Sequence, residues 1–274
     1  MNVRIVGYSV AVAAVAVLFA VQRVASQEGR TSVAGASLQL IDDLVVGNRI
    51  LANENILDGL GHISVRHDQN PNRFLLSRDL APELVTAADL IEYDLDGSPV
   101  SDKRRGYQER FIHAAIYKAR PDVRSVVHAH TPSVLVFADS SIPLRPMYHM
   151  AAFLGAGVPI WEIRKVQGSS GMLVNNSQLG TSLAQTLGDK AVALMRGHGV
   201  VIVGPSIPEA VSRGIFLDVN ARVQIQAIAL GGTVSFLGPQ DTTPPTQTAG
   251  QQAAPGGGGY PRSWPFWKAR AMGK

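Results

Sequence analysis

The stretch that decides the fold runs from Tyr107 to Thr131, YQERFIHAAIYKARPDVRSVVHAHT. Its first half has the spacing of a helix with one packed face and one solvated face. Pro121 ends this helix, because the residue before a proline is pushed out of the α region. The second half, residues 125–130, is rich in β-branched side chains and is predicted to be a buried strand. The stretch therefore predicts a helix followed directly by a core strand.

Histidines at the end of this strand indicate a metal site. His128 and His130 are two residues apart, so on a strand both imidazoles point to one face. Glu109, at the start of the helix, is expected to direct its carboxylate at the same strand end. His198, between two glycines, is the third candidate ligand. A single histidine is more often structural, but three histidines with an open fourth position are typical of a catalytic metal site.

These motifs, with GHISVR at 61–66 and RGHG at 196–199, resemble the class II aldolase/adducin family, typified by fuculose-phosphate aldolase. The resemblance covers residues 37–235. It implies an α/β fold of three αβα layers around a central, mainly antiparallel sheet. It also implies one divalent metal per chain, held by His128, His130 and His198, with Glu109 as general acid/base. Zinc is the first expectation, with Mn, Co or Fe as alternatives. A homotetramer with sites near subunit interfaces is expected as well.

The positions that hold a sugar phosphate in this family depart from its pattern. The family uses a G-N-x-S motif, a Thr-Gly turn and a serine pair before the glutamate. Here the asparagine position is His62, the Thr-Gly turn is Arg78-Asp79, and the serine pair is Tyr107-Gln108. A phosphate cradle of backbone amides and hydroxyls is not expected from these residues.

The motifs DGLGHISVR, SRDLAP and ERFIH are instead similar to a branch with decarboxylases of hydroxylated aromatic or pyridine carboxylic acids. In this comparison His62, Ser77 and Arg78 are predicted to bind substrate, since a guanidinium suits a planar carboxylate. Glu109 or His149 is predicted to deliver the proton. His149 falls where the aldolases place a catalytic tyrosine, and an ordinary loop histidine remains the alternative for it.

The implied function is a metal-dependent carbon–carbon lyase acting on a small molecule. The expected reaction is decarboxylation of a hydroxylated aromatic or heteroaromatic carboxylic acid, or aldol cleavage of a non-phosphorylated hydroxy-carbonyl compound. A sugar-phosphate aldolase or epimerase is one alternative. A non-catalytic, adducin-like binding module is the other, although adducin-like members lack the metal histidines that this chain keeps.

The rest of the chain alternates helices and strands, which favours one layered α/β domain. Helices are predicted at 37–55, 132–137, 179–187 and 208–230, and strands at 62–66, 73–77, 91–94, 158–163, 191–195 and 200–203.

Both ends of the chain differ in composition from this domain. Residues 1–27 predict a signal peptide or N-terminal membrane anchor, with Arg4 before an apolar run of about 17 residues. The protein is therefore expected to be exported, periplasmic or anchored facing outward, and cytoplasmic if the segment is not functional. Residues 238–259 predict a flexible linker. The aromatic and basic tail, 260–274, is expected to cover a neighbouring subunit's site or to touch a membrane surface.

Composition excludes several classes of function. The chain has 274 residues and no cysteine, which excludes disulfides, thiolate metal sites and cysteine nucleophiles. The net charge of +4 arises from the termini, because residues 27–241 hold 19 basic and 21 acidic residues. A nucleic-acid-binding surface is therefore not indicated.

Overall fold

The computed structural model describes residues 33–169, 171–242 and 262–273. The predicted signal segment and most of the predicted linker lie outside these ranges. Within them, seven strands form one sheet in the order β3-β2-β1-β4-β7-β6-β5. The neighbouring strands are antiparallel except for β5 and β6, which are parallel. The strands are β1 (His62–Arg66), β2 (Arg73–Ser77), β3 (Leu90–Asp94), β4 (Ser125–Ala129), β5 (Ile160–Trp161), β6 (Val192–Met195) and β7 (Gly199–Gly204).

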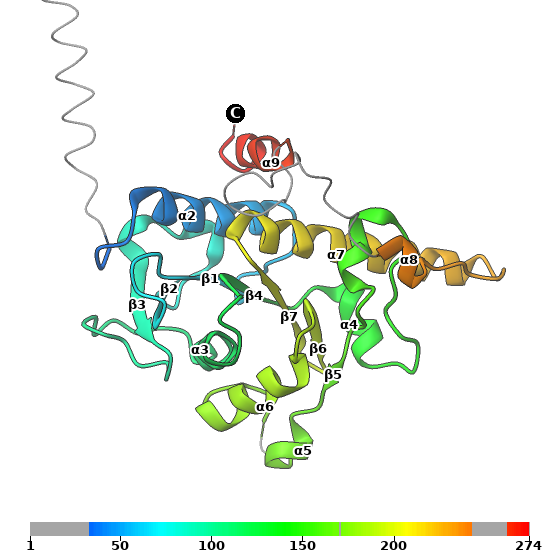
Figure 1. Ribbon diagram of the computed structural model, residues 1–274, viewed down its shortest axis with the longest axis horizontal. Helices are drawn as coiled ribbons and strands as arrows, with labels where there is room; N and C mark the ends of the chain where they lie inside the picture. Colours follow the sequence, from blue (N-terminus) through cyan, green and yellow to red (C-terminus); the bar gives the residue numbers. More distant parts are fainter. Residues whose placement is uncertain (1–32, 170, 243–261, 274) are drawn as a thin grey trace, which may run out of the picture.

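Helices cover both faces of this sheet (Figure 1). One face packs against α2 (Leu38–Asn53), α4 (Pro132–Ala138) and α7 (Ile207–Ala229), and the other against α3 (Arg110–Ala119) and α6 (Ser177–Leu187). Strand β4 shows the alternation: Val127 and Ala129 enter the first core, and Val126 enters the second. The three-layer α/β fold with a mainly antiparallel sheet is confirmed.

Local sequence signals fix most element boundaries. The Ser37 hydroxyl accepts a hydrogen bond from the Leu40 amide and caps α2, as its sequence predicts. The predicted strand at 158–163 is shorter than expected, because Ile163 already has helical backbone angles and leads into α5 (Arg164–Gln167). Residues 82–90, whose sequence predicts a short helical turn, form η1 (Pro82–Leu84) and η2 (Ala87–Asp89). Two further short helices are not predicted by the sequence, η3 (His149–Leu154) and α8 (Pro239–Thr242), and α8 lies at the start of the segment predicted to be a linker.

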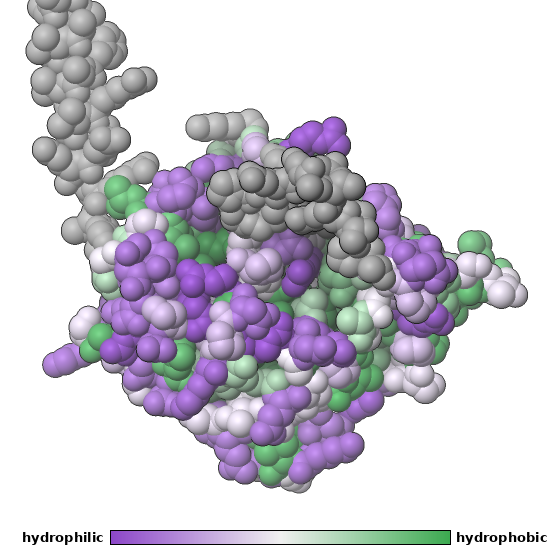
Figure 2. Space-filling view, viewed as in Figure 1, coloured by the Kyte–Doolittle hydropathy of each residue, from purple (hydrophilic) through white to green (hydrophobic). Residues whose placement is uncertain are grey.

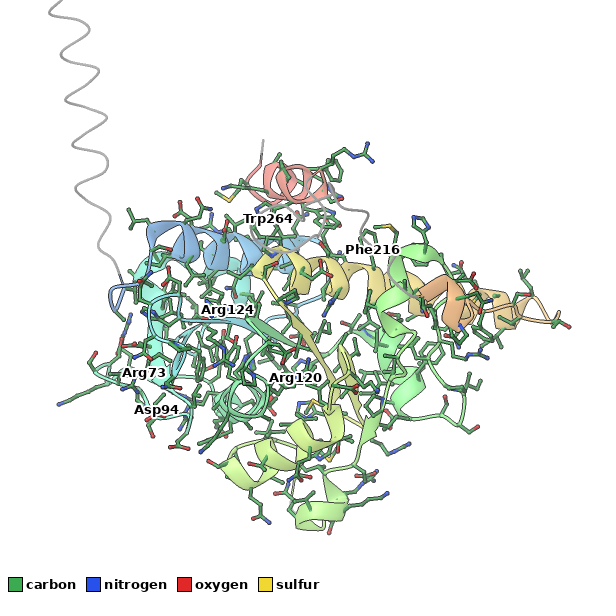
Figure 3. All side chains as sticks on the ribbon, in the orientation of Figure 1. Arg73, Asp94, Arg120, Arg124, Phe216 and Trp264 are labelled. Atoms are coloured by element: carbon green, nitrogen blue, oxygen red, sulfur yellow. The ribbon has the colours of Figure 1, made fainter. Side chains whose placement is uncertain are left out.

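The C-terminal tail forms a helix, α9 (Ser263–Ala271), which packs against α2 (Figure 1). Trp267 is buried there, with its ring edge-on to Phe216 of α7 at 5.8 Å between centroids. Trp264 is half-buried against the same core (Figure 3). Two of the tail's aromatic residues are thus used in packing within the chain. Among the described residues, no helix combines the length and apolar character needed to cross a membrane.

The edge of the sheet that is formed by β3 is strongly polar. Hydrophilic residues predominate over the part of the surface where β2 and β3 lie (Figure 2). Arg73 of β2 and Asp94 of β3 form an ion pair there, with 4.0 Å between nitrogen and oxygen (Figure 3). Charged side chains on edge strands oppose pairing with a second chain.

Candidate functional site

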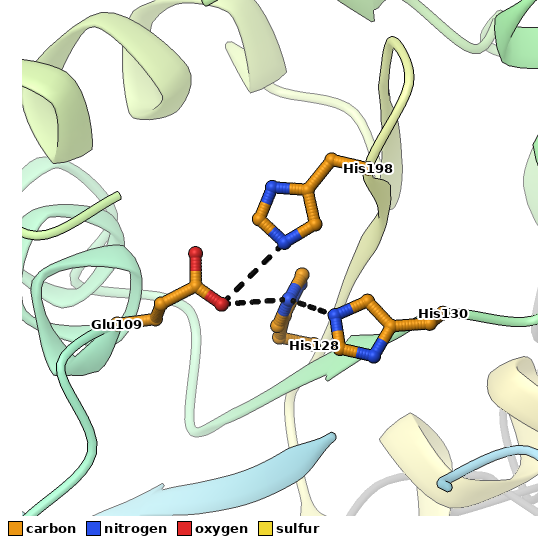
Figure 4. Close-up of side chains that lie close together, drawn as sticks. All are labelled: Glu109, His128, His130 and His198. Atoms are coloured by element: carbon orange, nitrogen blue, oxygen red, sulfur yellow. Dashed lines mark hydrogen bonds and ion pairs between the residues drawn. The ribbon is translucent and has the colours of Figure 1, made fainter. Parts of the chain in front are cut away.

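Four side chains from distant parts of the sequence converge at the carboxyl end of β4 (Figure 4). They are His128 in β4, His130 directly after it, His198 in the β6–β7 turn and Glu109 at the N-terminus of α3. Their candidate ligand atoms all lie within 4.8 Å of one another. The three predicted histidines and the predicted glutamate are therefore brought together in one cluster.

Backbone geometry holds two histidines of the cluster, His128 and His198, in place. His128 is paired in register with His62 of β1 and Val201 of β7, in the middle of the sheet. Gly197 precedes His198 with φ +65°, a left-handed conformation that favours glycine. The Gly197 amide donates to the Asp139 carboxylate at 3.0 Å, which anchors the turn that carries His198.

Hydrogen bonds at the outer ring nitrogens orient two of the imidazoles. His128 Nδ1 lies 3.2 Å from the Val200 carbonyl oxygen, which can only accept, so Nδ1 carries the proton. His130 Nδ1 lies 3.1 Å from the Asp58 carboxylate and donates to it. Both Nε2 atoms then present lone pairs to the cluster, the arrangement found around metal-ligating histidines.

Glu109 is also held by a fixed partner. Its Oε1 accepts the Val174 amide at 2.9 Å, and Oε2 lies 3.3 Å from His128 Nε2 and 3.4 Å from His198 Nε2. Burial raises the pKa of Glu109, but positive charge placed at the Nε2 atoms of His128 and His198 outweighs burial and holds this pKa well below its usual range. Glu109 is therefore a carboxylate in the cluster.

The donor set fits a divalent cation. His128 Nε2 and His130 Nε2 are 3.1 Å apart, and both present lone pairs, so a positive charge between them is needed to relieve their repulsion. Ligands about 2.1 Å from a tetrahedral ion lie roughly 3.4 Å apart, close to the 3.1–3.4 Å separations here. Three neutral imidazoles and a carboxylate suit zinc or a similar transition metal.

The residues predicted to bind substrate lie at different distances from this cluster. His62 is buried, and its ring centroid is 5.2 Å from that of His128. The buried Ser77 hydroxyl donates to the Tyr107 hydroxyl at 3.2 Å, so it faces a protein partner. Arg78 Nε donates to Asp89 at 2.7 Å, and its side chain is 39% exposed. The guanidinium is thus engaged with a carboxylate of the protein itself.

His149, the second predicted catalytic residue, lies apart from the cluster in this chain. It is the first residue of η3, is exposed, and its ring is 6.1 Å from that of Tyr148. Helix η3 contacts α7 and α8 on the other side of the sheet from Glu109. The chain alone does not bring His149 to the three histidines, and its catalytic role stays a prediction.

Sequence reasoning missed two groups of this site. Asp58, whose carboxylate accepts from His130 Nδ1, has no predicted role, although the motif DGLGH in which it occurs carries the family resemblance. His113 has no predicted role either, yet its Nε2 lies 2.7 Å from His62 Nδ1. The spacing of Glu109 and His113, one helical turn apart, is the signal that places both on the face of α3 toward the sheet.

Comparison with known proteins agrees with this geometry. The family model described as Class II Aldolase and Adducin N-terminal domain matches residues 42–225. The decarboxylase tropJ of Talaromyces stipitatus is 40% identical over 205 residues, covering 70% of this chain and 77% of the relative. A 3,4-dihydroxyphthalate decarboxylase of Arthrobacter keyseri is 32% identical, covering 70% and 80%. The solved L-fuculose 1-phosphate aldolase from Glaciozyma antarctica PI12 has 27% identity and a TM-score of 0.66, covering 85% and 89%.

Proposed function

This chain belongs to the class II aldolase and adducin family, and from that premise we propose that it is a carboxy-lyase acting on a hydroxylated aromatic carboxylic acid. Its relatives include a decarboxylase from Talaromyces stipitatus and 3,4-dihydroxyphthalate decarboxylases. The observation that carries the proposal is the convergence of Glu109, His128, His130 and His198, with two Nε2 lone pairs aimed inward.

In this proposal His128, His130 and His198 hold a divalent metal ion. When bound, such an ion supplies Lewis-acid stabilisation of the negative charge that develops on an oxygen next to the reacting carbon. Zinc, Mn, Co and Fe are all compatible with three imidazole ligands. The carboxylate of Glu109, 3.3 Å from His128 Nε2, is close enough to interact with an oxygen of the substrate beside these ligands.

The reaction balances with groups of this chain and the substrate. Glu109 accepts the proton of a substrate hydroxyl adjacent to the carboxylate. The proton held by Glu109 then passes to the ring carbon that carries the carboxylate, which the adjacent deprotonated oxygen makes electron-rich. The bond from that carbon to the carboxylate breaks, CO2 leaves, and the electron pair of the bond restores the aromatic ring. The carboxyl group is replaced by hydrogen, Glu109 is again a carboxylate, and the product phenolate takes up a proton from water.

The structure gives less support to the alternatives. At the positions where the family holds a phosphate, the His62 and Tyr107 rings contact each other at 4.4 Å, and the Ser77 hydroxyl is bonded to Tyr107. The Ser77 and Tyr107 hydroxyls are both engaged with protein acceptors, because Ser77 donates to Tyr107 and Tyr107 donates to the Leu80 carbonyl, which disfavours a sugar-phosphate aldolase or epimerase. The complete cluster disfavours a binding module without catalysis. Export and a homotetramer remain proposals from the sequence.

The test uses the purified full chain. Metal content is measured by elemental analysis, and CO2 release is measured with aromatic carboxylates that carry an adjacent hydroxyl, against sugar phosphates. We expect about one transition metal per chain and turnover of the hydroxylated carboxylates. His130→Gln, at a half-buried position, is expected to fold normally but lose metal and activity. A chain without metal after reconstitution, or one that cleaves only sugar phosphates, would overturn the proposal.

A further inference from the structure

A chain of hydrogen bonds runs through the core between β1 and α3, and ends beside the metal cluster. The Tyr117 hydroxyl lies 2.7 Å from Ser64 Oγ, and Ser64 Oγ lies 2.6 Å from His113 Nδ1. His113 Nε2 lies 2.7 Å from His62 Nδ1. All four side chains are at most 1% exposed. His62 and Ser64 share one face of β1, while His113 and Tyr117 are one turn apart on α3.

The direction of this chain is set at Tyr117. Burial raises the pKa of Tyr117 well above its usual range, so the phenol keeps its proton. Within the part of the chain that the structure describes, Ser64 Oγ is the acceptor available to that proton. A buried hydroxyl without an acceptor is costly, so Tyr117 donates to Ser64. The Ser64 hydrogen must then point to its other neighbour, His113 Nδ1.

This direction determines the tautomers of both histidines. His113 accepts at Nδ1, so its proton is on Nε2, which donates to His62 Nδ1. Because His62 accepts at Nδ1, its own proton is on Nε2. Burial keeps both rings neutral, lowering the pKa of His113 to about 3 and that of His62 well below its usual value. The four residues thus deliver a fixed N–H donor at His62 Nε2.

The position of His62 places this N–H donor beside the metal cluster. The residue is paired in register with His128, and its ring also contacts Tyr107 at 4.4 Å. The ring centroids of His62 and His128 are 5.2 Å apart, so the His62 ring lies directly beside one of the candidate ligands. In the described ranges, His62 Nε2 makes no hydrogen bond to the protein. The His62 Nε2–H group is therefore available to donate to a ligand that binds at the metal cluster and has an acceptor oxygen.

We propose that His62 is the donor that selects the substrate carboxylate, and that Tyr117, Ser64 and His113 are positioning residues that fix its tautomer. The inference rests on the proposed function for the identity of the ligand. The tautomer follows from the hydrogen bonds alone. An aromatic acid with a carboxylate next to its hydroxyl can contact the metal cluster through the hydroxyl and accept the His62 N–H through the carboxylate. The corresponding phenol has no carboxylate to accept this hydrogen bond.

Tyr117→Phe is the main test, because it removes one oxygen and keeps the ring that packs against Phe74. Tautomers are measured by NMR on the full-length holoenzyme with 15N-labelled histidine. We expect wild-type His62 and His113 to carry the proton on Nε2, and the variant to lose this preference. The Kd of salicylate is expected to rise about 10-fold in the variant, with the Kd of phenol unchanged.

The matched control is Tyr93→Phe. Tyr93 stacks on the same Phe74 at 5.3 Å, but its hydroxyl has no hydrogen-bond partner in the described part of the chain. This variant should keep the wild-type tautomers and affinities. His62→Gln, which can still accept from His113 and donate to the ligand, should retain the preference for salicylate over phenol, and His62→Leu should lose it. Metal content is measured in every variant to confirm that the cluster is intact.

Two results would overturn the proposal: a proton on Nδ1 of His62 in the wild type, or a Tyr117→Phe variant with unchanged tautomers and unchanged salicylate affinity. These outcomes are separate from failure of the proposed function. A wild-type chain with the expected tautomers and salicylate preference, but no CO2 release, would retain the donor and reject the carboxy-lyase reaction.

Discussion

Replacing Asp58 by asparagine is expected to weaken metal binding without disturbing the fold. Asp58 Oδ1 accepts the amides of Leu60 and Gly61 at 2.9 and 2.8 Å, and Oδ2 accepts from His130 Nδ1 at 3.1 Å. Asparagine keeps Oδ1 for the two amides but turns an NH2 group toward His130. Two donors would then face each other, so His130 favours the tautomer with its proton on Nε2, the atom that must bind the metal.

The expected size of the effect is a 10- to 100-fold loss of metal affinity, typical for loss of an outer partner of a ligating histidine. This corresponds to about 1.4–2.7 kcal/mol of binding free energy. The free energy of unfolding of the metal-free protein should change by roughly 0.5 kcal/mol or less, since the Asp58 side chain is 49% exposed and its turn is preserved.

Competition with a chromophoric chelator gives the metal affinity, and urea unfolding of the metal-free protein gives the stability. The control is Asp94→Asn, because Asp94 Oδ1 also accepts two amides, from Asp96 and Ser98, both at 2.9 Å, at a site away from the histidines. Asp94→Asn should bind metal as the wild type does. Equal affinities for the two variants would refute the argument that Asp58 orients His130.

Two further predictions concern stability. Gly180→Ala should lower the free energy of unfolding by about 1–3 kcal/mol in urea titrations, because its Cβ would lie 2.4 Å from the Phe111 carbonyl oxygen. Gly232→Ala, whose Cβ would meet nothing within 4 Å, should be nearly neutral, and equal effects would contradict this packing argument. The free energy of unfolding of the metal-free protein should also fall as the pH drops from 6.5 toward 3. His113 and His62 become protonated in the unfolded chain over this range but stay neutral when buried in the folded chain. The expected loss is about 1.4 kcal/mol per pH unit for each histidine, and a flat profile over the first unit below pH 6.5 would contradict it.

The sequence predicted the ligands well because their signals are local. His128 and His130 are two residues apart at the end of a β-branched run, and the strand that positions them is fully buried, as predicted. Glu109 is at the predicted helix start, and His198 lies in the glycine-flanked turn. A period of two on a strand, together with turn chemistry, is enough to place such groups without knowledge of the sheet order.

Other features follow from which strands and helices become neighbours. Asp58 reaches His130 across 72 residues of sequence, and Ser64 reaches Tyr117 across 53, through the pairing of β1 with β4 and the packing of α3 on that face. The docking of α9 on α2 likewise depends on the tertiary fold.

The sequence by itself thus determined the types of the main helices and strands, the family and the four groups of the cluster, because periodicity and short motifs are properties of neighbouring residues. The tertiary structure decided the protonated nitrogen of His62, His128 and His130, and the separation of His149 from the cluster. A ring nitrogen's proton depends on its hydrogen-bond partner, and that partner is supplied by sheet register and helix packing.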